Sequence, residues 1–355
     1  MSQLSKLTII ILTYNRPLFA IRSMKYWSGS DITVHILDGS SEALKETKRQ
    51  GISDNVHYHH LPISLYERLK LSVDMVKTEF SVLLSDDEYF LPKGLEICIN
   101  ELDNNKDIVA CMGRCLYMWP RKGRITLIPY YMWWKSIMQD TPQERMEASM
   151  SVLHSVTIYA VMRSENWINC IKILAEKEFS CVYIPEHQFE LFSVYQGKAK
   201  LIDELTWLRS GENHPTAFKN WNRDFGLEDW YRKKGNEEEF NEFFKILTKH
   251  ALAYDPGINI DETEKGFRKA GNIWVVKAES GKTRMSKIKE PFRKFAEKIA
   301  ANLPKSIKYP LKDLLGLNKN QFDFKEIPEK LKEMGISFDI DNLRVIEKQL
   351  KDFYN

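Results

Sequence analysis

The chain has 355 residues, more than one small module needs, so we expect one large domain or a domain with attachments. Its hydrophobic fraction of 43% and charged fraction of 28% are near globular averages, and 52 basic against 49 acidic side chains leave a net charge of +3. These values exclude wholesale disorder and argue against a globally basic nucleic-acid binder, so nucleic acid is not an expected partner.

The cysteines and the apolar runs indicate a reduced, cytoplasmic protein. Five cysteines are an odd number, and none forms a Cys-x-x-Cys pair, so neither a disulfide framework nor a structural zinc site is expected. No apolar run reaches the roughly 18 residues that a membrane-spanning helix needs. The first apolar run, 7–12, is too short for a signal peptide and predicts a buried strand.

Residues 7–105 alternate short β-branched runs with longer helical patterns, which is typical of βαβ units. We predict strands at 7–13, 32–37, 56–60 and 80–84, with helices around 17–27, 41–50, 64–77 and 92–103. The fold class is therefore α/β, with a doubly wound, mostly parallel sheet. Ligands of such sheets bind beyond the carboxyl ends of the strands.

The rest of the chain changes character. A hairpin with an aromatic flap is predicted for 107–135, followed by a strand at 156–162, helices at 164–177 and 186–196, and an extended return at 199–208. The pattern after Pro215 is helical and charged. We therefore predict a body at 1–220, divided into a half at 1–105 and a second half at 106–220, and a helical extension at 221–355.

Residues 282–313 depart from the near-neutral balance, with ten basic against three acidic side chains. Apolar residues recur there at helical spacing and form a stripe beside a basic face. This combination suits the anionic inner surface of a cell membrane, to which the protein would attach peripherally. A basic helix packed on its own domain explains the pattern equally well.

The strand at 80–84 delivers three consecutive acids, Asp86, Asp87 and Glu88, to its carboxyl end. Their mutual repulsion is destabilising unless a cation or donor groups offset it. Hard cations such as Mg²⁺ or Mn²⁺ bind one or two carboxylates plus substrate phosphates. The alternative is an acidic turn that caps the helix opening at Pro92.

Two further strands end in polar clusters on the same side of the predicted sheet. The first strand ends at Thr13-Tyr14-Asn15-Arg16, and the second at Asp38-Gly39-Ser40. Because the carboxyl ends of parallel strands meet at one edge, Asp38 and the 86–88 acids are expected to share a crevice.

In this order and spacing, residues 7–105 resemble the nucleotide-binding half of GT-A fold glycosyltransferases, most closely the family 2 type found in bacterial surface-glycan synthesis. The resemblance rests on the Thr-Tyr-Asn-Arg motif, the Asp-Gly-Ser motif, a basic residue on a helix, an acidic signature of the DxD type and a hydrophobic-Pro-x-Gly-Leu turn. Here these are 13–16, 38–40, Arg68, 86–88 and Leu91-Pro92-Lys93-Gly94-Leu95.

The resemblance implies a nucleotide diphosphate sugar donor, with a nucleotide-sugar-binding half at 1–105 and an acceptor and catalytic half at 106–220. The Thr13–Tyr14 backbone and Asp38 would contact the base, Arg68 the base or phosphate, and Asp86 the ribose. Glu88, with Asp86, would hold the metal that bridges the diphosphate. Glu88 departs from the aspartate usual in the family, and its longer side chain places the carboxylate about one methylene further out.

Inverting displacement at an anomeric carbon needs a carboxylate base for the acceptor hydroxyl. Family 2 members often carry an acidic pair eleven residues ahead of a glycine, and Glu186 stands eleven before Gly197. The pair itself is missing, because Pro185 precedes Glu186. Glu190 lies one helical turn later on the same face, so both glutamates are candidate bases, with Glu186 favoured by its spacing. The alternative for both is an ordinary acid near a helix N-terminus.

Two isolated basic side chains and an aromatic cluster complete the candidate set. His214 is a candidate metal or diphosphate contact, and Arg209 is a candidate diphosphate contact. Sugar rings stack on aromatic faces, so the flap offers an acceptor site, although the same residues would also suit a core. The acceptor candidates are Trp119, Tyr131, Trp133 and Trp134.

The sequence thus predicts a metal-dependent, inverting glycosyltransferase acting on a glycan or lipid-linked glycan. A non-catalytic nucleotide-sugar or glycan-binding protein of the same fold is the alternative. A nucleotidyltransferase is disfavoured, because the glycine-rich, arginine-containing signature expected after the first strand is missing.

Overall fold

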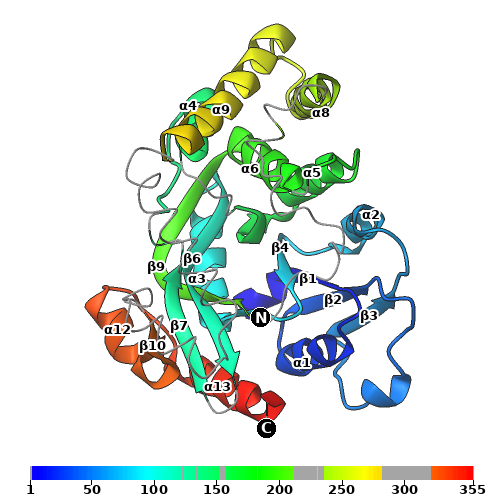
Figure 1. Ribbon diagram of the computed structural model, residues 1–355, viewed down its shortest axis with the longest axis vertical. Coiled ribbons are helices and arrows are strands. Elements are labelled where there is room, and N and C mark those ends of the chain that lie inside the picture. The colour runs from blue at the N-terminus through cyan, green and yellow to red at the C-terminus, as the bar shows by residue number, and fades with distance from the viewer. Residues whose placement is uncertain are drawn as a thin grey trace, which may run out of the picture.

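The computed structural model describes residues 2–121, 124–130, 132, 134–151, 157–181, 183–211, 230, 236–281 and 321–354. Within these ranges ten strands form one sheet, whose main path runs β10-β7-β6-β8-β4-β1-β2-β3, with β9 paired to β6 and β5 paired to β9. Helices flank this sheet, so the predicted α/β class is confirmed (Figure 1).

The N-terminal half of the sheet is parallel. It consists of β1 (Leu7–Thr13), β2 (Thr33–Asp38), β3 (Val56–His60) and β4 (Phe80–Ser85), with β1 between β2 and β4. β1, β2 and β4 are mostly buried β-branched and leucine residues, as expected for strands covered on both faces. α1 (Pro17–Trp27), α2 (Leu65–Met75) and α3 (Pro92–Asn104) connect or follow these strands. The carboxyl ends of β1, β2 and β4 therefore lie side by side.

The predicted hairpin is confirmed as β6 (Ile108–Arg121) and β7 (Arg124–Tyr130), which pair antiparallel. β9 (Lys198–Ser210) runs parallel to β6 with several register shifts, and it also pairs with the short β5 (Tyr89–Phe90). This second pairing brings the end of β9 against the chain that follows the 86–88 acids.

Helices gather at one end of the molecule. α4 (Pro142–Met150) and α5 (Ser164–Leu174) each pack on α6 (Ile184–Gln196), α8 (Glu237–Tyr254) packs on α5 and α6, and α9 (Ile260–Gly281) packs on α4 and α8 (Figure 1). Buried residues from all five helices join the main core.

The C-terminal residues return to the sheet. β10 (Phe322–Asp323) pairs with β7, and η4 (Phe324–Glu326), α12 (Ile327–Glu333) and α13 (Ile340–Tyr354) follow it. Leu343, Ile346 and Leu350 of α13 belong to a second core, which also contains Tyr89 and Leu91. Part of the predicted helical extension therefore completes the sheet and its second core.

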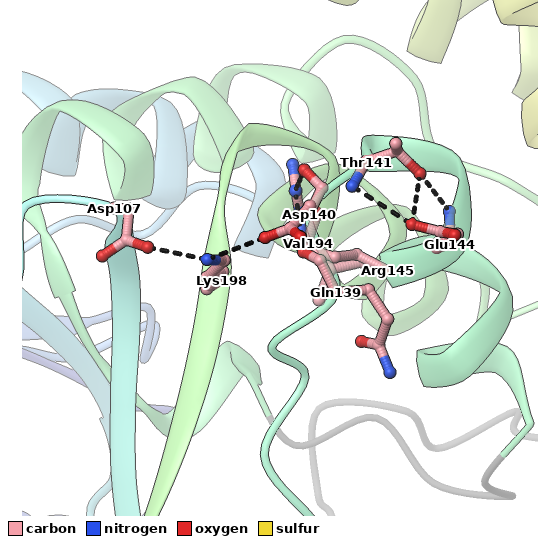
Figure 2. A network of polar contacts seen from close by, with 8 residues as sticks. All are labelled: Asp107, Gln139, Asp140, Thr141, Glu144, Arg145, Val194 and Lys198. Atoms are coloured by element: carbon pink, nitrogen blue, oxygen red, sulfur yellow. Dashed lines mark hydrogen bonds and ion pairs between the residues drawn. The ribbon is translucent and has the colours of Figure 1, made fainter.

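One buried arginine ties α4 to the end of α6. The guanidinium of Arg145 donates to four backbone carbonyls, those of Gln139, Asp140, Val194 and Tyr195, over 2.7–3.2 Å. Figure 2 shows this group beside Lys198, whose ammonium lies 2.9 Å from Asp107 and 3.2 Å from Asp140. The last carbonyls of a helix have no amide donor within that helix. Arg145 donates to two such carbonyls at the end of α6, those of Val194 and Tyr195.

Two local predictions were wrong. The helix expected at 41–50 is reduced to the short 3₁₀ turn η2 (Glu46–Lys48), because this connection follows the Asp38–Ser40 turn closely. The strand expected at 156–162 is η3 (Thr157–Tyr159) followed by the three-residue β8 (Val161–Arg163).

η1 (Gln3–Lys6) precedes β1. All five cysteines are buried free thiols.

Candidate functional site

The ends of β1 and β2 are joined through a buried arginine. Arg68 Nη1, on α2, donates to the carbonyls of Thr13 at 2.8 Å and Leu37 at 2.9 Å. The Gly39 amide also donates to Thr13 at 3.0 Å. A Cβ at Gly39 would lie 2.5 Å from Arg68 Cζ, so only glycine lets the guanidinium reach both carbonyls. Arg68 thus positions the two strand ends.

Asp38, the last residue of β2, accepts hydrogen bonds that fix the turn after this strand. Its carboxylate accepts from the backbone amide of Ser40 at 2.9 Å, from the Ser40 hydroxyl and from the Tyr58 hydroxyl at 2.7 Å. The Ser40 hydroxyl in turn accepts from the amide of Asn15 at 2.8 Å. Asn15 has a φ of 55°, a left-handed conformation that asparagine tolerates better than most residues.

A cavity of about 600 Å³ opens beside these strand ends. This volume lies within the range of small-molecule sites. The lining includes Tyr14, Gly39, Ser41, Ile63, Tyr66 and Arg68. A smaller hollow of about 290 Å³ adjoins it, lined in part by Asn15, Asp38 and Ser40. Predicted nucleotide-binding residues therefore line two neighbouring hollows.

Asp86 and Asp87 follow β4 and are both held by Arg16. Asp86 accepts from the Thr13 hydroxyl at 2.6 Å and lies 3.2 Å from the Arg16 guanidinium, while Asp87 lies 2.5 Å from it. Burial raises the pKa of Asp86 to about 7, and the charge of Arg16 and the Thr13 hydrogen bond act in the opposite direction. Thr13 and Arg16 therefore join the end of β1 to the end of β4, which the sequence pattern places at the same edge of the sheet.

Glu88 points toward β9. Its carboxylate accepts from the indole Nε1 of Trp207 at 3.0 Å and lies 3.8 Å from Nε of Arg209. Burial raises the pKa of Glu88 to about 8, the charge of Arg209 lowers it, and the neighbouring Asp87 raises it. Trp207 and Arg209 are two residues apart on one strand, so they share a face and meet the same carboxylate.

Arg209 is the central cation of the site. Its guanidinium carbon lies 5.3–5.8 Å from the ring centroids of Tyr130, Trp207 and Tyr159. Burial raises the pKa of Glu186, and the charge of Arg209 lowers it. Burial also raises the pKa of Tyr159, with smaller contributions from Glu186 and Glu88. Glu88 thus lies beside Arg209, and Glu186, at the start of α6, is near enough for the charge of Arg209 to lower its pKa.

Glu190 lies in the core and does not belong to this cluster. It is 1% exposed, and its carboxylate accepts from the Ser149 hydroxyl and from the amide and hydroxyl of Thr157. These bonds join α4, α6 and η3. The prediction that Glu190 could face the cleft is corrected, because a carboxylate saturated by buried donors has a structural task.

The aromatic candidates divide between surface and core. Trp119 is 38% exposed and lies 5.8 Å from the ring of Tyr117, which in turn lies 5.2 Å from Tyr130 beside Arg209. Trp134 is only 3% exposed and belongs to the main core, so its assignment to the acceptor site is corrected. Tyr131, Trp133 and His214 lie outside the described residues.

Sequence reasoning missed Tyr159 and Trp207 as parts of the site. A signal was available for Trp207, because it alternates with Arg209 on the predicted extended return. Tyr159 gives no such signal, since only the three-dimensional packing of η3 brings it to 4.7 Å from the Trp207 ring.

The side-chain atoms of residues 86–88 that could bind a metal are all carboxylate oxygens. No group of three His, Cys, Asp or Glu residues that could hold a metal occurs in the described part of the chain. Carboxylate oxygens are the kind of ligand that a hard divalent cation prefers, and such a cation usually completes its coordination with substrate phosphate oxygens. Among the described residues, no helix is long and apolar enough to cross a membrane.

Neither a protein-family model nor a curated protein matches the chain. Among solved structures, similar ones include S. aureus TarS, at 10% identity and a TM-score of 0.48, over 77% of this chain and 43% of that one. S. aureus TarS 1-349 in complex with UDP-GlcNAc is 11% identical with a TM-score of 0.48, over 100% and 89% of the chains. This chain spans less than half of the first structure's length. The case for a function therefore rests on the geometry above.

Proposed function

We propose that the chain is an inverting glycosyltransferase that moves a sugar from a nucleotide diphosphate donor to a glycan or lipid-linked glycan. The observation that carries the proposal is the ion pair of Glu88 with Arg209 at the end of β9, together with Glu186 in the first turn of α6, whose pKa the charge of the same arginine lowers. Displacement at an anomeric carbon needs a carboxylate base for the acceptor hydroxyl and positive charge at the leaving diphosphate, which Arg209 and a cation held by Glu88 would supply. The resemblance of 13–16, 38–40 and 86–88 to family 2 motifs supports the same conclusion.

The donor would bind with its nucleoside in the cavity beside Tyr14, Gly39 and Arg68. Its diphosphate would then extend toward the ends of β4 and β9. There the guanidinium of Arg209, held among three aromatic rings, offers charge-assisted hydrogen bonds to phosphate oxygens. Glu88, with Asp86, would hold a Mn²⁺ or Mg²⁺ ion, which supplies positive charge at the leaving group when bound.

Glu186 is the proposed base. Its carboxylate takes the proton of the acceptor hydroxyl while that oxygen bonds to the anomeric carbon. The bond between the anomeric carbon and the diphosphate oxygen breaks, and its electron pair leaves with the nucleoside diphosphate. The raised pKa of Glu186 suits this task, because a base is most effective when its pKa approaches the working pH. Trp119, Tyr117 and Tyr130 form an aromatic wall on which an acceptor sugar would stack.

The test is release of nucleoside diphosphate from a panel of nucleotide sugars with Mn²⁺, for the wild type, Glu186→Gln and Glu190→Gln. We expect Glu186→Gln to lower kcat by about 10²- to 10⁴-fold and to leave donor affinity unchanged. Glu190→Gln should instead lower the thermal stability, with activity retained below its melting point. Nucleotide binding without turnover in the wild type would favour the non-catalytic binding protein.

We also propose that residues 282–313 attach the protein to the anionic inner face of a membrane. The basic stretch lies outside the described residues, so support comes from its charge pattern alone. Since 321–354 complete the sheet, the sharper test replaces Lys287, Lys289, Lys294 and Lys298 with glutamine and keeps the full chain. Sedimentation with vesicles rich in phosphatidylglycerol should fall in this variant, and undiminished binding would refute the proposal.

A further inference from the structure

The last turn of α13 lies against α1, next to the chain that carries the 86–88 acids. The ring of Phe353 lies 5.1 Å from the ring of Phe19, and the guanidinium carbon of Arg22 lies 4.6 Å from Phe353 and 4.8 Å from Phe19. Arg22 is therefore stacked on two aromatic rings, one near each end of the chain. Such contacts are attractive because ring faces carry negative charge.

Arg22 connects this stack to the acid run. It is 3% exposed, and its Nη2 donates to the backbone carbonyl of Asp87 at 3.0 Å. The same guanidinium lies 5.3 Å from the ring of Tyr89, which follows Glu88. The backbone at the centre of the acid run is thus fixed by an arginine whose own position depends on Phe353.

Phe19 also supports the second arginine. The guanidinium carbon of Arg16 lies 4.5 Å from the Phe19 ring, and Arg16 pairs with both Asp86 and Asp87. The ring of Phe19 therefore contacts both Arg16 and Arg22, the two arginines that bind residues 86–87. Phe353 packs against the same ring.

The position of Phe353 is set independently of these contacts. Leu343, Ile346 and Leu350 anchor α13 in the second core, and Gln349 donates to the Arg22 carbonyl at 3.1 Å. Removing the Phe353 ring should therefore leave α13 docked and loosen only the stack.

We propose that Phe353 is a positioning residue for the donor site, in which the C-terminal helix fixes Arg22 and Phe19 and thereby the Asp86–Glu88 carboxylates. This inference rests on the proposed function, because the acids are taken to bind the donor diphosphate. Its consequence is that donor binding depends on the last residues of the chain, 265 or more positions beyond the acids they support.

The test compares Phe353→Ala with Phe353→Tyr, which keeps the ring, and with Leu350→Ala, which weakens the second core without removing the stack. UDP affinity is measured by calorimetry with Mn²⁺ at a temperature where all variants are folded. We expect Phe353→Ala to weaken UDP about five- to tenfold, Phe353→Tyr to restore the affinity and Leu350→Ala to leave it unchanged. Donor KM should rise in parallel, with kcat little changed.

Hydrogen exchange of the amides in 85–91 separates this inference from the proposed function. Faster exchange there in Phe353→Ala, with wild-type rates in Phe353→Tyr, supports the positioning role of Phe353 even if the wild type binds no nucleotide. Unchanged exchange and unchanged UDP affinity in Phe353→Ala would overturn it. Equal losses in Phe353→Ala and Leu350→Ala would also overturn it, because they would reduce Phe353 to a general contributor to stability.

Discussion

Arg209 and Glu186 show how single residues set the chemistry of this site. A carboxylate that is withdrawn from water holds its proton more tightly, and a nearby guanidinium offsets part of that effect. Burial raises the pKa of Glu186, and Arg209 lowers it. The balance between these two influences determines the pH at which the proposed base becomes available.

We predict an acid limb in the pH dependence of kcat. As the pH falls through the raised pKa of Glu186, the carboxylate gains a proton and can no longer accept one, so kcat falls. The midpoint should lie above the usual range of a glutamate. Removing the positive charge in Arg209→Met should move the midpoint to still higher pH, because only the effect of burial remains. Rates at saturating donor and acceptor between pH 5 and 9 would show this. A limb at the usual glutamate pKa, or one unmoved by Arg209→Met, would count against Glu186 as the base.

The difference between Glu186 and Glu190 shows where sequence reasoning stopped at the residue scale. A spacing of four residues places both on one face of a helix. However, α6 is buried around almost its whole circumference from His187 onward, so a shared face does not mean a shared environment. Glu186 in the first turn of α6 has its pKa lowered by Arg209, whereas Glu190 in the second turn accepts hydrogen bonds from Thr157 and Ser149. Only the packing of α4 and η3 on α6 distinguishes the two acids.

At the scale of elements, the site is an arrangement of strand ends. β1, β2 and β4 are parallel neighbours, so their polar carboxyl ends meet, and this much follows from the sequence pattern. What unites them is less predictable: Arg68 bridges the ends of β1 and β2, and Arg16 reaches from the end of β1 to the acids after β4. The geometry of these bridges depends on tertiary packing that no local pattern records.

Gly39→Ala should test the bridge made by Arg68. The added Cβ would lie 2.5 Å from Arg68 Cζ, and the guanidinium cannot retreat without losing its two carbonyl acceptors. We expect about 1–3 kcal/mol lower stability and about tenfold weaker UDP binding. Gly257→Ala, in the turn between α8 and α9, is a matched control that should change neither quantity. Wild-type UDP affinity in Gly39→Ala would show that the strand ends tolerate a shift of Arg68.

At the scale of the whole molecule, contacts distant in sequence complete the fold. β10 adds a strand beside β7, and α13 packs on α1, although the sequence predicts only a small helical extension. A two-residue strand carries too little pattern to be recognised, and the partner of an amphipathic helix cannot be read from its own residues. The parallel half-sheet was predictable because its strands and helices alternate locally.

Arg145 should matter more to stability than its neighbouring surface pairs. Arg145→Met removes the donors of four backbone carbonyls, so we expect a loss of about 3 kcal/mol or more in the free energy of unfolding. Lys198→Ala breaks ion pairs with Asp107 and Asp140, whose side chains are largely exposed, and should change stability little. Chemical denaturation of both variants makes the comparison. Equal small losses would contradict a central structural role for Arg145.

The most direct test of the central claim is a calorimetric titration of UDP into the wild type and Gly39→Ala, each with and without Mn²⁺. We expect saturable 1:1 binding of UDP to the wild type, with an affinity that Mn²⁺ strengthens and that Gly39→Ala weakens about tenfold. No binding to the wild type, or binding that Gly39→Ala leaves unchanged, would contradict a nucleotide-diphosphate site at the ends of β1, β2 and β4.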